Sequence, residues 1–117
     1  MKKVLLLSPQ GTDVSETRNV LLQSGLRPEN ILAKSITEIP PSDFPRIVAK
    51  NDISRVLIFG IDPGTIKTLM QKVQKTLQNQ ICPQFFKKAE GEKDQNLTFK
   101  GVTGSCKVIN CPTEIFR

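Results

Sequence analysis

Apolar runs separated by amphipathic segments dominate the first two-thirds of the chain. Lys3–Ser8 (KVLLLS) and residues 55–61 (RVLIFGI) are nearly continuous apolar runs, which is typical of strands covered on both faces of a parallel sheet. Residues 29–36 (ENILAKSI) predict another strand. Because segments with helical periodicity lie between and after these runs, the pattern predicts successive strand–helix–strand units.

Three helices are predicted after the three runs. In the first, one face carries Val14, Thr17, Leu21 and Leu22. Asp13 and Glu16 form a variant of the capping box at its start. Gly25 supplies the left-handed residue that ends this helix. A short helix is expected over residues 44–51, where Ser42 or Asp43 can cap and Pro45 suits the first turn. The third helix follows Asp62, with apolar residues at helical spacing: Ile66, Leu69, Met70, Val73 and Leu77.

The order of these elements predicts a single α/β domain, a small three-layer sandwich with a mainly parallel sheet of the Rossmann-like or flavodoxin-like kind. Residues 1–80 form its core, and residues 81–117 form a C-terminal extension of the same domain. In that extension, residues 82–95 are expected to be a loop, and residues 96–102 and 106–110 to form one or two short strands. Gly101 and Gly104 suit the turn between them.

The stretch GIDPGT, residues 60–65, allows three interpretations. An acidic residue at the end of an apolar strand is how metal-dependent nucleases of the Holliday-junction-resolvase type begin, which would make Asp62 a metal ligand. In those nucleases, however, the chain continues into a hairpin and further carboxylates return. Here a helical pattern follows and no acidic cluster is evident, so Asp62 as N-cap with Pro63 at the first helical position is favoured. Phosphate binding between Gly60 and Gly64 is disfavoured by the negative charge of Asp62.

A small crevice is predicted where the first and third strands end. If the strand order is 2-1-3, the loops after Ser8 and after residue 61 meet at the carboxyl edge, where open α/β sheets bind ligands. The residues that would line it are Ser8, Gln10, Thr12, Asp62 and Thr65. Ordinary loop chemistry also explains these residue types. No metal site and no cofactor is predicted, and the absence of histidine excludes catalysis and metal binding by that side chain.

Positive charge gathers in the second half of a chain with 117 residues and a net charge of +6. Residues 63–89 hold five lysines and no acidic residue: Lys67, Lys72, Lys75, Lys87 and Lys88. Such a surface docks an acidic protein or nucleic acid, or it is simply a solvated face of the protein. The pair Phe85–Phe86 beside it is either an apolar anchor for a partner or part of the core.

Cysteine content and hydropathy bear on the compartment. Cys82, Cys106 and Cys111 are odd in number and form no CxxC pair, so free thiols in a reducing compartment are expected. No signal-peptide pattern and no stretch long enough to span a membrane is present. These features predict a soluble cytoplasmic protein.

Two family resemblances follow from these residues. The segment LLQSGLRPENILAKSITEI, preceded by KVLLLS and followed by RVLIFGID, resembles the psi subunit of the bacterial DNA polymerase III clamp-loader assembly, and TLQNQIC is similar to its closing helix. The resemblance implies a small α/β adaptor without catalysis that binds the chi subunit. The sequence has no counterpart of the amino-terminal psi arm that engages the clamp loader.

The second resemblance is to one half of uroporphyrinogen-III synthase. It is carried by VLLLSPQG, SGL, SITEIPPSD and VLIFGID, although the TS usual in that family is replaced by Gly60-Ile61. This family binds its substrate between two α/β domains.

Together these features predict an accessory protein-binding subunit, without catalysis of its own, in a nucleic-acid-processing assembly. Two alternatives stay open. One is a small-molecule enzyme or ligand-binding module that uses the carboxyl-edge crevice. The other is direct nucleic-acid binding through the lysine-rich third helix.

Overall fold

The computed structural model describes residues 3–78, 82–89 and 96–116. Within them, the strands form one sheet in the order β2-β1-β3-β4-β6-β5, and all neighbouring pairs are parallel except β5 with β6. The strands are β1 (Lys3–Ser8), β2 (Ile31–Ser35), β3 (Ile53–Ile58), β4 (Gln84–Lys88), β5 (Leu97–Thr98) and β6 (Ser105–Ile109). The helices are α1 (Ser15–Gln23), α2 (Phe44–Lys50) and α3 (Pro63–Thr76), with 3₁₀ turns η1 (Pro28–Asn30), η2 (Ile36–Glu38) and η3 (Pro112–Phe116).

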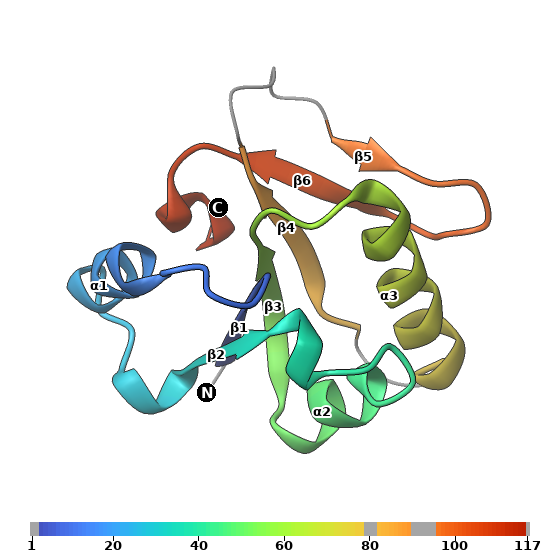
Figure 1. Ribbon diagram of the computed structural model, residues 1–117, viewed down its shortest axis with the longest axis horizontal. Helices are drawn as coiled ribbons and strands as arrows, with labels where there is room; N and C mark the ends of the chain where they lie inside the picture. Colours follow the sequence, from blue (N-terminus) through green and yellow to red (C-terminus); the bar gives the residue numbers. More distant parts are fainter. Residues whose placement is uncertain (1–2, 79–81, 90–95, 117) are drawn as a thin grey trace.

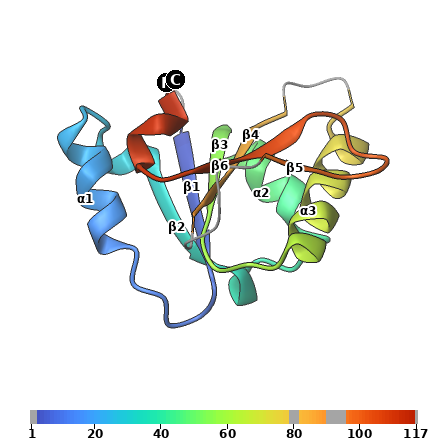
Figure 2. The same cartoon turned by 90° about the horizontal axis from the view of Figure 1, so that it is seen from above.

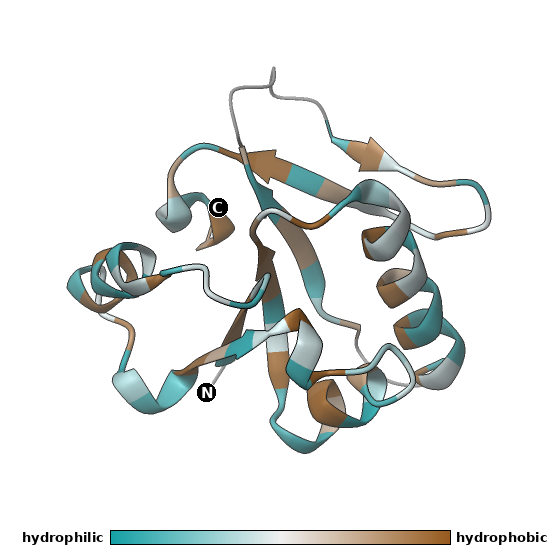
Figure 3. Cartoon of the chain, viewed as in Figure 1, coloured by the Kyte–Doolittle hydropathy of each residue, from teal (hydrophilic) through white to brown (hydrophobic). Residues whose placement is uncertain are grey.

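Helices cover both faces of the sheet. α1 and η3 lie on one face, and α2 and α3 lie on the other (Figures 1 and 2). Helix α3 presents its apolar positions to the sheet and its polar positions outward (Figure 3). The structure therefore confirms the predicted α/β sandwich with a mainly parallel sheet.

The central strands are buried on both sides, which explains their unbroken apolar runs. In β1, Leu5 and Leu7 pack under α2 and α3, while Val4 and Leu6 pack under α1. All four side chains are fully buried. Alternate residues of a strand point to opposite faces, so a strand covered on both faces needs an apolar residue at every position.

Strands β1 and β3 are neighbours. Leu7 pairs with Ile58, and the backbone N–H of Phe59 donates to the carbonyl of Leu7 at 2.9 Å. The loops after β1 and β3 therefore leave the sheet side by side at its carboxyl edge, as the order 2-1-3 requires. This is the point where the chain reverses its direction of travel across the sheet.

The two ends of α1 differ in how well the sequence predicts them. The capping box of Asp13 and Glu16 is wrong, because the N-cap is Val14 and the Asp13 carboxylate accepts instead from the N–H of Ser15 at 2.9 Å. That bond closes a local turn before the helix rather than capping it. The C-terminal prediction is confirmed: Gly25 has φ of 108°, and the N–H of Leu26 reaches back to the helix.

The loop predicted over residues 82–95 is wrong for Gln84–Lys88, which form β4 in the interior of the sheet. Phe85 is 5% exposed and packs on the α3 face, whereas Phe86 is 1% exposed and packs on the α1 face. In β4, two large aromatic side chains thus bury apolar surface on both faces of the sheet. In β1 and β3, longer apolar runs do the same. Their interpretation as core is confirmed. Residues 90–95 lie outside the described residues.

The short strands predicted near the C-terminus are confirmed as β5 and β6. They are antiparallel, with Leu97 opposite Cys106. Gly101 and Gly104 lie in the turn between them with φ of 80° and 79°, a region that favours glycine.

An arginine in β3 holds η3 against the sheet. Nε of Arg55 donates to the carbonyl oxygen of Ile115 at 2.6 Å, and its guanidinium lies 5.3 Å from the ring centre of Phe116. The Ile115 side chain is fully buried in the α1-face core. A half-buried charged side chain therefore anchors the last turn of the described chain.

Candidate functional site

Asp62 is the N-cap of α3, as the sequence predicts. Its Oδ2 accepts from the backbone N–H of Thr65 at 3.0 Å, and its Oδ1 accepts from the Thr65 hydroxyl at 2.7 Å. Pro63 follows as the first helical residue. Both carboxylate oxygens are thus used within the helix start, and one of the otherwise unpaired N–H groups of the first turn, that of Thr65, gains an acceptor.

The charge of Asp62 governs what this helix start can bind. Hydrogen bonds from the side chain and then the backbone of Thr65 lower the pKa of the carboxyl below the usual aspartate value. A Cβ on Gly64 would lie 3.1 Å from Oδ2 of Asp62, so glycine lets the carboxylate approach closely. An anion at this end of α3 would therefore meet a fixed negative charge.

Replacing Asp62 by alanine is expected to lower the melting temperature by roughly 3–6 °C at neutral pH, because the cap is lost. Since the folded pKa is lowered, the carboxylate stabilises the protein above the ordinary aspartate pKa. That contribution disappears as the pH falls through the lowered value. The difference between wild type and variant should shrink as the pH falls below the ordinary aspartate pKa, in thermal unfolding followed by circular dichroism.

A matched control separates the charge of the cap from its hydrogen bond. Asp62→Asn keeps an acceptor oxygen and removes the charge, so it should lose less stability than Asp62→Ala. Equal stability of wild type and Asp62→Ala at neutral pH would contradict the capping role.

The carboxyl-edge residues are brought to one region but are engaged in different ways. Ser8 is buried at the end of β1, and Gln10 and Thr12 are exposed in the following loop. Asp62 and Thr65 bind each other, as described above. Over residues 3–78, 82–89 and 96–116, no cluster of three or more Cys, Asp or Glu side chains is arranged to hold a metal ion.

Two lysines of α3, Lys72 and Lys75, face an open groove, called here the basic groove. It measures about 610 Å³ and lies between the outer face of α3 and the turn before β6. Its lining residues are Thr68, Gln71, Lys72, Gln74, Lys75 and Gly101. Lys72 and Lys75 are exposed and Lys67 is half-buried. Within the described part of the chain, neither Lys72 nor Lys75 forms an ion pair.

The other two predicted lysines lie elsewhere. Lys87 and Lys88 belong to β4, and Lys87 is 8% exposed. The structure therefore does not bring them onto the outer face of α3. Instead Lys100, exposed beside Gly101 in the turn before β6, adds a cation next to the groove.

A second depression, the amino-edge pocket, was not predicted from the sequence. It measures about 480 Å³ and lies where β4 and β6 begin, beside the end of α3. Its apolar lining consists of Met70, Leu77, Cys82, Pro83, Phe85 and Phe86. Its polar lining includes Gln74, Gln78, Gln84, Thr103, Ser105 and Lys107.

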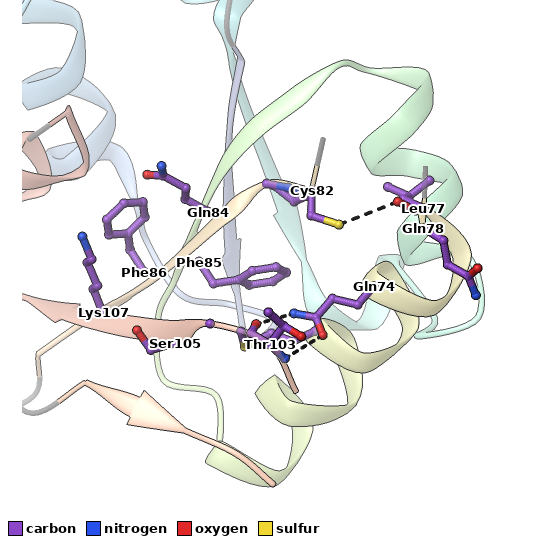
Figure 4. A pocket seen from close by; sticks show the side chains of 13 residues that line it. Gln74, Leu77, Gln78, Cys82, Gln84, Phe85, Phe86, Thr103, Ser105 and Lys107 are labelled. Atoms are coloured by element: carbon purple, nitrogen blue, oxygen red, sulfur yellow. Dashed lines mark hydrogen bonds between the residues drawn. The ribbon is translucent and has the colours of Figure 1, made fainter. Parts of the chain in front are cut away.

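Gln74 stands between the groove and the pocket and lines both. Its side-chain amide accepts from the N–H of Thr103 at 3.0 Å and donates to the carbonyl of Thr103. Figure 4 shows this pair bridging α3 and the turn before β6, with the Phe85 ring on the α3 side and Phe86 and Lys107 on the other side of β4. Residues 29 positions apart make this contact, so the sequence carries no local signal for it.

The three cysteines have distinct surroundings. Cys106 is buried in β6, and burial raises the pKa of its thiol to about 12. Cys82 is half-buried in the amino-edge pocket, and Cys111 is exposed after β6. All three are free thiols. At neutral pH the Cys106 thiolate is scarce, so only the other two are accessible to thiol reagents.

Comparison with known proteins gives no matching family model and no matching curated protein. In the described residues, each helix is too short or too polar to cross a membrane.

Proposed function

We propose that this chain is an accessory domain without catalysis of its own, which binds an acidic segment of a protein partner in the basic groove. The observation that carries the proposal is the charge of the surface around α3. Residues 63–78, 82–89 and 96–109 contain no Asp or Glu. Among the lysines of these ranges, Lys72 and Lys75 are exposed in the basic groove, and Lys100 is exposed beside it. A surface of one sign attracts a partner of the other sign.

The contrast with another cationic groove strengthens the argument. A depression of about 310 Å³ between β2 and α2 is lined in part by Lys34, Arg46 and Lys50. There Lys34 pairs with Glu38 at 3.8 Å, and Arg46 pairs with Asp43 at 3.5 Å. Lys34 and Arg46 thus each have an acidic neighbour within the chain, although exposed pairs of this kind are weak.

Among the described residues, no acidic side chain pairs with Lys72 or Lys75 of helix α3. Lys72 and Lys75 lie three residues apart on one face, where like charges slightly destabilise a helix. Lys75 in the last turn is favourable to the helix dipole, but Lys72 lies too far from the end to share that benefit. An acidic partner would relieve the repulsion between the two.

A protein partner is favoured over nucleic acid because the lining of the basic groove contains no aromatic side chain on which a base could stack. The cations are lysines, which act as point charges on a carboxylate as readily as on a phosphate. The resemblance to the psi family supports a setting in a nucleic-acid-processing assembly, where a small adaptor binds a protein subunit.

The test is a pull-down from a lysate of the source organism with wild type and two double variants. Lys72→Gln/Lys75→Gln removes two charges from the groove. The control, Arg27→Gln/Lys34→Gln, removes two exposed charges that form only weak surface pairs near β2. The expected result is one stoichiometric protein that wild type and control recover, also after nuclease treatment, and that the groove variant loses.

Two results would contradict the proposal. Recovery of the same protein by the groove variant would show that the partner does not bind through the lysines of the basic groove. Loss of all bound material after nuclease treatment, together with steep salt dependence, would favour the nucleic-acid alternative.

A further inference from the structure

We infer that the amino-edge pocket receives an apolar side chain of the same acidic segment that lies in the basic groove. The inference rests on the proposed function and adds the sequence character of the partner. The bound segment would carry a large apolar residue close to a run of acidic residues. The argument depends on how the two depressions adjoin and on the chemistry of the pocket lining.

The two depressions adjoin along α3. Gln74 lines both, and its bond to Thr103 stands between them. A segment lying over this bridge has the exposed Lys72 and Lys75 on one side and Leu77 on the other. From Lys72 to Leu77 the helix rises by roughly 7 Å, which is the length of about two or three residues of extended chain.

The lining of the pocket suits an apolar side chain rather than a second charge. Met70, Leu77 and Phe85 are each nearly buried and form its floor on the α3 side. The side chains around that floor are mostly uncharged amides and hydroxyls, so they can bond the backbone of a bound segment. Interfaces commonly place an apolar anchor in such a pocket, with polar and charged contacts around it.

The charges near the pocket favour the same partner. Lys107 is exposed at its rim, and the described segments that line it contain no acidic residue. Among the described lining residues, acidic side chains on either side of an apolar anchor would therefore meet only positive or neutral groups. The volume, about 480 Å³, is also in the range of small-molecule sites, so the experiment must distinguish a peptide side chain from a free ligand.

Cys82 provides a way to fill the pocket without changing the groove. In a Cys111→Ser background, Cys82 is the accessible thiol, because burial keeps Cys106 protonated and enclosed. Benzyl methanethiosulfonate then attaches a benzyl group to Cys82 through a disulfide, and dithiothreitol removes it. The probes are two fluorescent decapeptides, one with a single Phe two residues before four Glu and one with Ala in place of that Phe.

The expected result is that the Phe peptide binds about tenfold or more tightly than the Ala peptide, as burial of one aromatic side chain predicts. Blocking Cys82 should lower the affinity of the Phe peptide to that of the Ala peptide. The affinity of the Ala peptide should not change. Dithiothreitol should restore the difference. Lys72→Gln/Lys75→Gln should weaken both peptides by roughly tenfold.

Failures of the two ideas are distinguishable. If the lysine variant leaves both peptides unaffected, the proposed function fails. If both peptides depend on the lysines but bind equally, or if blocking Cys82 leaves the Phe peptide unchanged, the inference about the pocket fails and a free small molecule becomes its better occupant.

Discussion

Replacing Phe86 by alanine is expected to lower the free energy of unfolding by about 3–5 kcal/mol. The ring lies in β4, is 1% exposed and packs in the α1-face core with Leu57, Ile109 and Ile115. Removing the ring takes apolar area out of the core and leaves a cavity between the sheet and η3. The close-packed side chains around the cavity can relax only partly to fill it. Urea unfolding followed by circular dichroism measures the change.

Phe116→Ala is the matched control. This ring is 40% exposed and touches the guanidinium of Arg55, so its loss should lower stability by about 1 kcal/mol or less. If Phe86→Ala were as mild as Phe116→Ala, Phe86 would not be a core residue and its interpretation as a surface anchor would return.

Replacing Arg55 by methionine is expected to lower stability by roughly 1.5–3 kcal/mol, the range for a lost hydrogen bond to a charged group. Methionine retains an apolar stem, but it cannot donate to the Ile115 carbonyl, which Arg55 Nε approaches at 2.6 Å. The contact with the Phe116 ring is lost with it. Hydrogen exchange should show the amides of η3 opening more readily than those of β1.

Arg55→Lys tests whether the geometry or the charge holds η3. Lysine keeps the positive charge but lacks the planar fork of donors that reaches Ile115 and stacks on Phe116 at once. An intermediate loss is therefore expected. Unchanged stability and unchanged exchange in η3 for Arg55→Met would mean that apolar packing of Ile115 alone anchors this turn.

Local signals predict the first half of the fold well. The unbroken apolar run of β1 is explained by burial on both faces, and Gly25 ends α1 because only glycine adopts its backbone conformation without strain. The role of Asp62 follows from its place before Pro63 and a helical pattern. A local capping pattern also predicts Asp13 as the N-cap of α1, which is wrong because the N-cap is Val14. Asp13 is only one residue away, and its side chain can form several competing local hydrogen bonds.

Long-range contacts explain what the sequence could not predict. β4 has only two apolar residues, yet β3 and β6 pair with both of its edges, so its state depends on strands distant in the chain. The link of Gln74 to Thr103 has the same origin. Of the candidate residues, Lys72 and Lys75 share one depression, whereas Lys87 is inside the sheet.

The antiparallel pairing of β5 with β6 has a consequence for how the chain folds. β5 and β6 pair across a short turn, whereas every parallel pair joins strands separated by a helix or by another strand. Closing a short loop loses less chain entropy and takes less time than bringing distant segments together. We therefore expect the β5–β6 hairpin to form early, and the meeting of β1 with β3 across α1, β2 and α2 to limit the folding rate.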